Sequence, residues 1–323
     1  MRFPSDLLRR CWFLAGPTAC GKSEVAVELA ERMKSHRNQA MEIVSLDSMT
    51  LYRRMNIGTA KPTGDQIERV PHHLFDVLEP SQDFSVAEYL ASAEQICQAI
   101  VTRGHTPLFV GGTGLYLRSL LRGVFAGPPA NDAIRARLVE EVERDGKEAL
   151  FARLQEVDPP TAARLHPNDV RRVIRALEVS ELTGKPMSSQ HQEAPLPPAE
   201  RPRHVYSLEP PRNWLYQRID ERVLTMMSAG WIDEVRALMS EPQPLSLTAS
   251  QALGYHELIE HLQGRLTLPE AITQIQTRTR QFAKRQHTWF RNLDECVAVP
   301  INSRDNAASI VERIMEAAHS LRD

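Results

Sequence analysis

Cysteine is scarce in this chain, and no hydrophobic run is long. The four cysteines are Cys11, Cys20, Cys97 and Cys296. They form no CxxC pair and have no histidine at zinc-ligand spacing, which argues against a zinc site and a disulfide framework. The apolar run "CWFLA" near the N-terminus is too short for a signal peptide or a membrane span. We therefore expect free thiols in a reducing cytoplasm and no contact with a membrane.

An excess of charge of one sign is also missing. The chain has 39 basic and 41 acidic residues, a net charge of −2, so any nucleic-acid site must be a local patch. Hydrophobic residues make up 42% and charged residues 25%, as in globular proteins with a sizeable core. With 323 residues and no repeats or low-complexity tracts, we expect two domains, or one α/β domain with an insertion.

Short apolar runs alternate with helical patterns in the first third of the chain, which is typical of a parallel sheet. The expected strands cover residues 11–15, 41–45, 106–110, 204–209 and 296–300. One helix is expected over Lys22–Met33. A second should begin after Ser85, which forms a capping box with Glu88, and should stop near Gly104.

Residues 132 to about 193 have an entirely helical pattern, and the proline-rich "APLPPAERPRH" that follows suits a linker. We predict an α/β fold with a P-loop NTPase-like parallel sheet core and a largely helical C-terminal part. The core would comprise residues 1–127 and 201–323, and a helical insertion domain would comprise residues 128–200.

The stretch "GPTACGKS", residues 16–23, has the spacing of a phosphate-binding loop. Its glycines would let backbone N–H groups face phosphate oxygens at the positive end of the next helix. Lys22 would add a charge, and the Ser23 hydroxyl is a ligand for Mg²⁺. The metal-binding Asp strand of a nucleotide hydrolase is not evident nearby. The loop therefore predicts a bound diphosphate without saying what carries it.

Two further stretches should reach the same edge of the sheet. Asp47 follows the second strand and would be a proton acceptor or metal ligand there, unless it is only a turn or N-cap residue. "VGGTGLYLRSLLRG", residues 110–123, leaves the third strand through glycines that bring Thr113 close, although a structural turn would use glycines too. In "PHHLFDV", the adjacent His72 and His73 would point in different directions, which favours packing over a metal site.

Two basic stretches are candidates for binding RNA. "HPNDVRRVIRALEV" places Arg171 and Arg175 one helical turn apart. "TRTRQFAKRQHTWFR", residues 277–291, has five Lys or Arg side chains, three aromatic ones and no acid. This mixture suits a phosphate backbone with stacked bases. A solvated basic helix whose aromatic residues face the core would give the same pattern.

Together these stretches resemble the tRNA dimethylallyltransferase (tRNA isopentenyltransferase) family, bacterial type. The resemblance is carried, in order, by "GPTACGKS", "DSMTLYRRMNIGTAKP", "PHHLFD", "FSVAEY", "GGTGLY", "HPNDVRRVIRALE", "LYQRIDERV", "ALGYHE" and "TRQFAKRQHTWFR". It implies transfer of a dimethylallyl group from dimethylallyl diphosphate to N6 of the adenosine 3′ of the anticodon, position 37. It also implies a swinging helical insertion and a channel that the flipped base and the diphosphate enter from opposite ends.

The resemblance assigns roles to individual residues. Asp47 would accept the N6 proton, Thr113 would lie beside the bridging oxygen, and Lys22 would stabilise the leaving diphosphate with Mg²⁺ held through Ser23. Either Arg218 or Arg222 would clamp the diphosphate. The implied catalytic residues are Asp47, Thr113, Lys22 and Arg222. The implied diphosphate-binding residues are Gly16, Pro17, Thr18, Ala19, Cys20, Gly21, Lys22, Ser23 and Arg218.

The resemblance also implies contacts with tRNA, through its anticodon stem-loop. The implied contact residues are Asp47, Ser48, Met49, Thr50, Arg135, Arg171, Arg172, Val173, Ile174, Arg175, Gln251, Ala252, Leu253, Gly254, Tyr255, His256, Lys284, Arg285, Gln286, His287, Thr288, Trp289, Phe290 and Arg291. Thr50 stands where the family usually has Gln, and Cys20 where Ser is common. The expected oligomeric state is a monomer.

Three other functions share parts of this pattern. A nucleotide or small-molecule kinase would have the same phosphate loop, and an enzyme that prenylates free AMP would be closer still. The basic C-terminal stretch argues against both, because a small substrate does not require it. A non-catalytic RNA-binding module would leave the phosphate loop and Asp47 unexplained.

Overall fold

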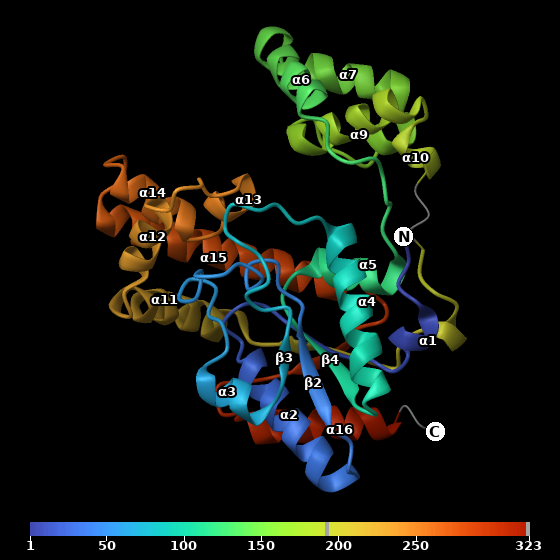
Figure 1. Ribbon diagram of the computed structural model, residues 1–323, viewed down its shortest axis with the longest axis vertical. Helices are drawn as coiled ribbons and strands as arrows, with labels where there is room; N and C mark the ends of the chain where they lie inside the picture. The colour runs from blue at the N-terminus through green and yellow to red at the C-terminus, as the bar shows by residue number, and fades with distance from the viewer. Residues whose placement is uncertain (191–193, 321–323) are drawn as a thin grey trace. The chain divides into compact units, whose positions relative to one another are not determined.

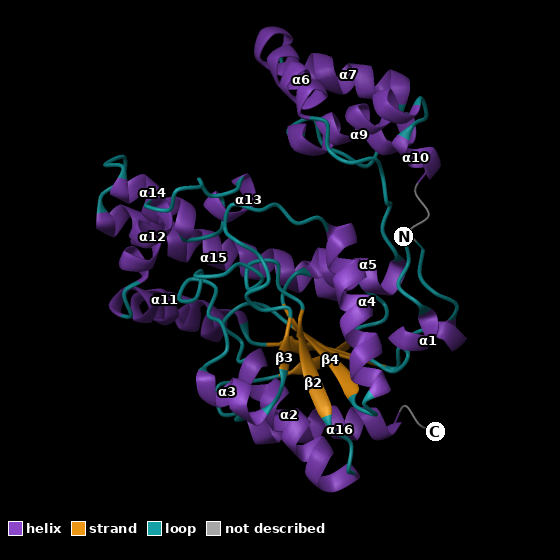
Figure 2. Ribbon diagram, in the orientation of Figure 1, coloured by secondary structure: helices purple, strands orange, loops and turns teal. Residues whose placement is uncertain are grey.

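The computed structural model describes residues 1–190 and 194–320. Within them, six strands form one parallel sheet in the order β3-β2-β4-β1-β5-β6 (Figures 1 and 2). The strands are β1 (Trp12–Ala15), β2 (Met41–Ser45), β3 (His72–His73), β4 (Thr106–Gly111), β5 (His204–Glu209) and β6 (Val297–Pro300). The five strands expected from the sequence are confirmed, and the two-residue β3 is an addition.

Helices make up most of the remaining secondary structure of the described chain. They are α1 (Ser5–Leu8), α2 (Lys22–Arg37), α3 (Gly64–Arg69), α4 (Val86–Thr102), α5 (Gly114–Arg122), α6 (Asp132–Asp145), α7 (Lys147–Val157), α8 (Pro159–Ala162), α9 (Val170–Thr183), α10 (Met187–Gln190), the 3₁₀ turn η1 (Pro198–Glu200), α11 (Arg212–Ser228), α12 (Trp231–Met239), α13 (Leu247–Ser250), α14 (Tyr255–Leu262), α15 (Leu268–Arg291) and α16 (Ala307–Ser320). None of the described helices is both long and apolar enough to cross a membrane.

Local sequence signals set the helix boundaries. The capping box predicted for α4 is present, with Ser85 Oγ accepting the Glu88 N–H at 3.2 Å and Glu88 Oε2 accepting the Ser85 N–H at 2.8 Å. Helix α2 runs past its expected end at Met33 to Arg37, with Lys34, His36 and Arg37 in its last turn. The Lys34 and Arg37 cations face the negative end of the helix dipole, which favours the extra turn.

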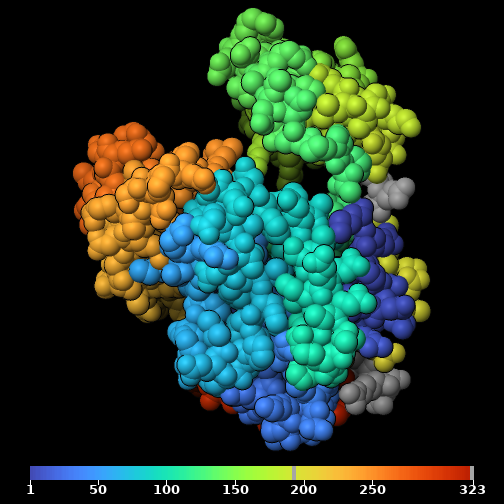
Figure 3. Space-filling model, viewed as in Figure 1, coloured from blue at the N-terminus to red at the C-terminus, as the bar shows by residue number. Residues whose placement is uncertain are grey.

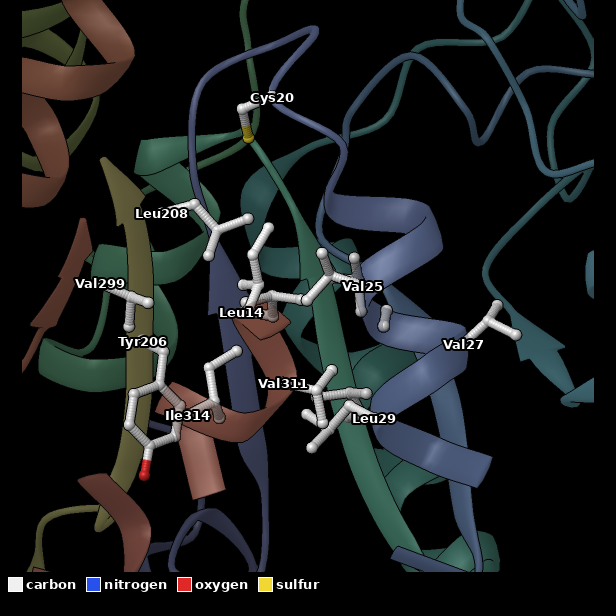
Figure 4. Close-up of a cluster of buried hydrophobic side chains, with 14 of the residues drawn as sticks. Leu14, Cys20, Val25, Val27, Leu29, Tyr206, Leu208, Val299, Val311 and Ile314 are labelled. Atoms are coloured by element: carbon white, nitrogen blue, oxygen red, sulfur yellow. The ribbon is translucent and has the colours of Figure 1, made fainter. Parts of the chain in front are cut away.

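The sheet is buried on both faces, as parallel sheets usually are. On one face, Leu14 and Leu208 pack with Leu29 of α2 and with Val311 and Ile314 of α16 (Figure 4).

Side chains that alternate with Leu14 point to the other face. There Phe13 stacks on Phe109 with ring centroids 5.0 Å apart, and Phe3 meets Phe109 edge-on. Tyr89 of α4 stacks on Tyr116 of α5 at 3.8 Å. These layers hold the carboxyl ends of β1, β2 and β4 in register beside one another.

The chain divides into two compact units. One contains Phe3–Leu121 and Leu196–Asp323, with the sheet; the other contains Arg122–Pro195 with Met1–Arg2. The sequence placed the helical insertion at 128–200. The described part of the smaller unit, α6 to α10, has a core of its own around Leu138 and Leu154. Residues 191–193, at the end of the predicted helical segment, and 321–323 lie outside the described residues.

Within the larger unit, the α12–α14 region packs on the loop that precedes α4. The Ser246 N–H donates to the Pro80 carbonyl at 2.8 Å, and the Thr248 hydroxyl donates to Asp83 at 3.2 Å. Figure 3 shows this contact, where the orange segment lies against the cyan one. Residues 246–248 and 80–83, which are far apart in the sequence, therefore pack against each other.

One buried carboxylate ties β2 to the neighbouring loops. Glu42 is 3% exposed and accepts hydrogen bonds from Arg103, His73 Nε2 at 2.6 Å and His105 Nδ1 at 2.7 Å. Burial by itself would raise the pKa of Glu42, but these bonds outweigh it and lower the pKa to about 2. The ionised form is therefore the one the fold stabilises.

Glu42→Gln should lower the free energy of unfolding by about 1–3 kcal/mol at neutral pH, because it leaves Arg103 without its carboxylate. The contribution of Glu42 is fully present above pH 4.5, its unfolded pKa, and is lost as pH falls towards about 2. Urea denaturation at both ends of this range measures it. The exposed Glu68→Gln is the matched control, and a Glu42→Gln deficit that is the same at both ends would contradict the argument.

Candidate active site

The phosphate loop connects β1 to α2 through residues that need left-handed backbone. Ala19 has φ +65° and Gly21 has φ +91°. An L-residue such as Ala19 is destabilised there by about 1–2 kcal/mol. Neighbouring side chains must therefore hold the loop in this shape.

Three side chains from three helices hold consecutive residues of the loop. Lys22 Nζ donates to the Pro17 carbonyl at 2.7 Å. The next residue, Thr18, donates its N–H to Gln286 Oε1 at 2.9 Å. The carbonyl of Ala19 accepts from Arg218 Nε at 3.0 Å. The loop is thus fixed from α2, α15 and α11.

The N-terminus of α2 opens towards the loop. Gly21 is its N-cap, and no side chain of residues 1–190 or 194–320 caps it. The first N–H groups of the helix, at its positive end, are consequently available to an anion. The Ser23 hydroxyl at this end makes no hydrogen bond to another of the described residues and lines the adjoining cavity.

The carboxyl ends of β2 and β4 place the predicted acid and hydroxyl side by side. Asp47 Oδ1 accepts the Met49 N–H at 2.9 Å. Thr113 Oγ1 accepts the Ser48 N–H at 3.1 Å, and the Thr113 N–H donates to the Leu46 carbonyl at 3.0 Å. Gly111 permits this approach, because a Cβ there would lie 2.2 Å from the Leu46 carbonyl oxygen.

Asp47 shares its cavity with two cations, Lys22 and Arg222. Burial raises its pKa, while the Met49 N–H, Lys22 and Arg222 lower it, and the net pKa is above its ordinary value. Burial also lowers the pKa of Arg222, which Asp47 counteracts. A carboxylate with a raised pKa is a stronger proton acceptor once it is ionised.

A cavity of about 570 Å³ in the larger unit joins the phosphate loop to Asp47. Its lining includes Thr18, Ala19, Gly21, Lys22, Ser23, Asp47, Thr50, Gly111, Gly112, Arg218, Arg222, Phe282 and Gln286. The Thr113 side chain is not part of the lining, although Gly112 beside it is. The predicted loop, carboxylate and both candidate arginines therefore meet in one cavity.

The two arginines of α11 have different partners. Arg218 is committed to the Ala19 carbonyl and lies over the Trp214 ring at 4.9 Å. Arg222, one turn further on, is close to Asp47 and lines the cavity. Only the tertiary structure separates these roles, because the sequence places both on the same helix face.

The basic helix α15 has features of both structures that its sequence allowed, an exposed basic surface and a helix packed on the core. Lys284, Arg285, Thr288 and Arg291 are exposed, His287 and Trp289 are half-buried, and Gln286 and Phe290 are buried. Arg278 and Arg280 form ion pairs with Glu257 and Asp220. Part of the basic charge is thus structural, and Phe290 faces the core.

Half of the 251–256 segment, which the resemblance assigned to tRNA contacts, is buried. Ala252, Gly254 and Tyr255 are buried, whereas Gln251 is exposed and Leu253 and His256 are half-buried. A Cβ on Gly254 would lie 2.0 Å from the buried Trp231 ring. The buried members of this segment support its shape rather than form its surface.

Glu234, which sequence reasoning missed, fixes a loop next to this segment. Its Oε2 accepts the N–H groups of Asn56 and Ile57 at 2.8 Å, and its Oε1 accepts the Tyr255 hydroxyl at 2.6 Å. The loop continues into Thr59 and Ala60, which line the cavity. Nothing in the spacing around Glu234 signals this role.

In the smaller unit, a second missed carboxylate organises the predicted arginines. Glu178 is fully buried and accepts from Arg135 at 2.9 Å, Arg175 at 2.7 Å and the Asn131 N–H at 2.7 Å. The sequence does contain a signal for this role, because Glu178 follows Arg175 by three residues on α9, a spacing that brings the two side chains together.

The other predicted residues of α9 divide between surface and core. Arg171 and Arg172 are exposed. Val173 and Ile174 are buried in the core of the unit. A contact between RNA and these side chains would need them at the surface, where they are not.

The two adjacent histidines have separate partners. His72 Nδ1 lies 2.7 Å from the Val70 carbonyl, and His73 pairs with Glu42. No group of three or more potential metal-ligating side chains occurs among the residues that the structure describes.

Sequence comparison connects this arrangement with known proteins. A family profile described as IPP transferase matches residues 50–293. The tRNA dimethylallyltransferase of Rhodopirellula baltica is 42% identical over 315 residues, covering 96% of this chain and 94% of its own. That of Symbiobacterium thermophilum is 48% identical over 282 residues, covering 86% and 85%.

Solved structures give the same result. The full-length tRNA isopentenylpyrophosphate transferase of Bacillus halodurans superposes with a TM-score of 0.69 at 38% identity, over 97% of both chains. A eukaryotic dimethylallyltransferase described as acting on tRNA has a TM-score of 0.75 at 26% identity, over 97% of this chain and 79% of its own.

Lys22→Ala should weaken binding of inorganic pyrophosphate by about 10- to 100-fold, because it removes a charge-assisted hydrogen bond from a partly buried site. Titration calorimetry measures this affinity. Lys34→Ala, at an exposed position of the same helix, is the matched control. Equal pyrophosphate affinity in wild type and Lys22→Ala would show that the loop does not hold the diphosphate.

Proposed function

The chain belongs to the IPP transferase family, and we propose that its reaction takes place in the cavity that joins the phosphate loop to Asp47. That reaction is the transfer of a dimethylallyl group from dimethylallyl diphosphate to N6 of adenosine 37 of tRNA. The family and activity expected from the motifs are confirmed by relatives that cover nearly the whole chain. They decide against the kinase and the free-AMP enzyme. The observation that carries the proposed site is that a carboxylate, Asp47, lines the same cavity as the phosphate loop and the two cations Lys22 and Arg222.

The diphosphate would bind at the start of α2. The free N–H groups after Ala19 and the Lys22 ammonium face the cavity there. Both arginines line the cavity, and we assign the clamp to Arg222, because the Nε of Arg218 is already committed to the Ala19 carbonyl. The two cations beside Asp47 would gain interaction energy as charge develops on the departing diphosphate.

The donor set at the loop suits Mg²⁺ rather than a metal held by protein alone. Ser23 offers one hydroxyl that has no partner in the described part of the chain, and magnesium commonly binds through few protein ligands together with substrate phosphates. When bound, Mg²⁺ would offset negative charge on the leaving diphosphate. Its protein ligand would be Ser23.

Asp47 would accept the proton from the N6 amine as the new C–N bond forms. The amine is a weak nucleophile because its lone pair is delocalised into the purine ring, so removal of its proton during attack lowers the barrier. Asp47 is held for this by the Met49 N–H, which donates to Oδ1, and by a backbone hydrogen bond from Thr50.

Thr113 would act at the other end of the breaking bond. Its oxygen accepts the Ser48 N–H, and its hydroxyl donates to no acceptor among residues 1–190 and 194–320. A hydrogen bond from this hydroxyl to the bridging oxygen would stabilise the charge that forms when the C–O bond breaks. Because Ser48 neighbours Asp47, the same backbone turn aligns the proton acceptor and this donor.

The tRNA, through its anticodon stem-loop, would contact the exposed face of α15 and the arginines of α9. Lys284, Arg285 and Arg291 offer charge without an ion-pair partner among the described residues. We propose that the enzyme works as a monomer in the cytoplasm, where tRNA is available and the four free thiols stay reduced.

Asp47→Asn should slow prenyl transfer by about 10²–10⁴-fold while tRNA binding persists. The assay mixes the protein with labelled dimethylallyl diphosphate, Mg²⁺ and bulk tRNA, identifies the labelled nucleoside, and uses free AMP as a control acceptor. In wild type, activity should fall as pH drops through the raised pKa of Asp47, hence at a pH above its ordinary 3.8. Near-normal turnover of the variant would remove Asp47 as the proton acceptor.

Binding of tRNA should weaken with salt, with a slope of about −0.7 to −0.9 per neutralised phosphate. Lys284→Ala should reduce this slope by about one phosphate contact. Filter binding over a series of salt concentrations measures it, with the exposed Arg304→Ala as control. A slope that Lys284→Ala leaves unchanged would take α15 out of the RNA contact.

A further inference from the structure

We propose that Gln286 is a positioning residue that couples tRNA bound on α15 to the diphosphate site. The inference rests on the proposed function and extends it. The motifs grouped Gln286 with the residues that touch tRNA. Its side chain is instead buried on the inner side of α15, where it lines the cavity and contacts the two loops that would hold the reacting groups.

Both polar ends of the Gln286 side chain are occupied. It is 3% exposed; its Oε1 accepts the Thr18 N–H at 2.9 Å, and its Nε2 donates to the Gly112 carbonyl at 2.8 Å. Thr18 belongs to the phosphate loop, and Gly112 immediately precedes Thr113. One amide therefore joins the loop under the leaving group to the turn that carries the hydroxyl donor.

Two glycines make this approach of α15 possible. A Cβ on Gly112 would lie 2.1 Å from Gln286 Nε2, and one on Gly114 would lie 2.7 Å from Trp289 Cβ. Gln286 and Trp289 are three residues apart and so share one side of the helix. The turn after β4 is thus shaped to receive this side of α15.

Charge distinguishes Gln286 from the other two supports of the loop. Lys22 and Arg218 hold the Pro17 and Ala19 carbonyls, and both are cations that a bound diphosphate would attract. Gln286 is neutral and holds Thr18 with no charge to be drawn away. Its hydrogen bond to Thr18 is thus the one of the three supports that involves no charge.

The geometry of α15 provides the route to RNA. Lys284, Arg285 and Thr288 are exposed within one turn of the buried Gln286 on the same 24-residue helix. A small shift or rotation of α15 when RNA binds would move the Gln286 amide. Because this amide touches Thr18 and Gly112 directly, such a movement would alter the phosphate loop without any intermediate element.

Gln286→Met keeps the length of the side chain and removes both hydrogen bonds. The test measures tRNA affinity with and without saturating inorganic pyrophosphate and Mg²⁺, and pyrophosphate affinity with and without bulk tRNA. In wild type each ligand should change the affinity of the other by the same factor, about fivefold or more. In Gln286→Met this factor should fall to about one, and the KM for dimethylallyl diphosphate should rise about tenfold with tRNA affinity alone unchanged.

The matched control is Gln276→Met, which removes an amide of the same helix that bonds to the Asp220 carbonyl at 3.2 Å. It should keep the coupling factor, and melting curves of both variants check that they are folded. An unchanged coupling factor in Gln286→Met, or no coupling in wild type, would overturn the inference. A loss of tRNA affinity alone would return Gln286 to the RNA contacts.

These binding measurements need no prenyl transfer. If the wild-type protein does not prenylate tRNA but shows a coupling that Gln286→Met loses, the proposed function is refuted and the inference stands. If the wild-type protein prenylates tRNA and Gln286→Met leaves the coupling unchanged, the proposed function stands and the inference is refuted.

Discussion

The shape of the phosphate loop is the constraint on which the site depends. Ala19 and Gly21 have left-handed backbone, and this turns the amides at the start of α2 towards the cavity. Such a conformation is unfavourable for Ala19 by itself. It persists because Lys22, Gln286 and Arg218 hold three consecutive residues from three different helices. The loop shape that the proposed diphosphate site requires is therefore a property of the packed core and not of the eight-residue motif alone.

The charges around Asp47 follow from the same packing. Burial favours the neutral acid, while Lys22 and Arg222 favour the carboxylate, and the net result is a raised pKa. The same two cations face the place where the diphosphate would bind. In the proposed reaction, the proton acceptor and the diphosphate would thus share their counter-charges, which would link removal of the N6 proton to departure of the diphosphate. Glu178 and Glu234 have a structural role, because each carboxylate accepts hydrogen bonds from several donors. Glu234 thereby fixes a loop, and Glu178 fixes a pair of arginines.

Much of the fold could be predicted because its signals are local. The strand at 41–45 and the capping box of Ser85 and Glu88 depend on residues within a few positions of one another. β3 was missed because two residues are too few to show any periodicity. The sequence allowed two interpretations of the basic helix, an RNA-binding surface or a solvated helix packed on the core. It could not decide between them, because it does not show which arginines have acidic partners elsewhere. Arg278 finds Glu257 and Arg280 finds Asp220 only after the chain has folded.

By itself, the sequence determined the elements that carry chemistry: a strand followed by a phosphate loop, an acid at the end of the next strand and a basic helix near the C-terminus. Those features are set by neighbours along the chain. Only the tertiary structure decided which side chains complete the site. Gln286 reaches Thr18 across 268 residues of sequence, and Arg218 and Arg222 take different partners on one helix face. Such pairings depend on how helices pack on the sheet, because burial and distance, rather than spacing along the chain, decide which polar groups can satisfy one another.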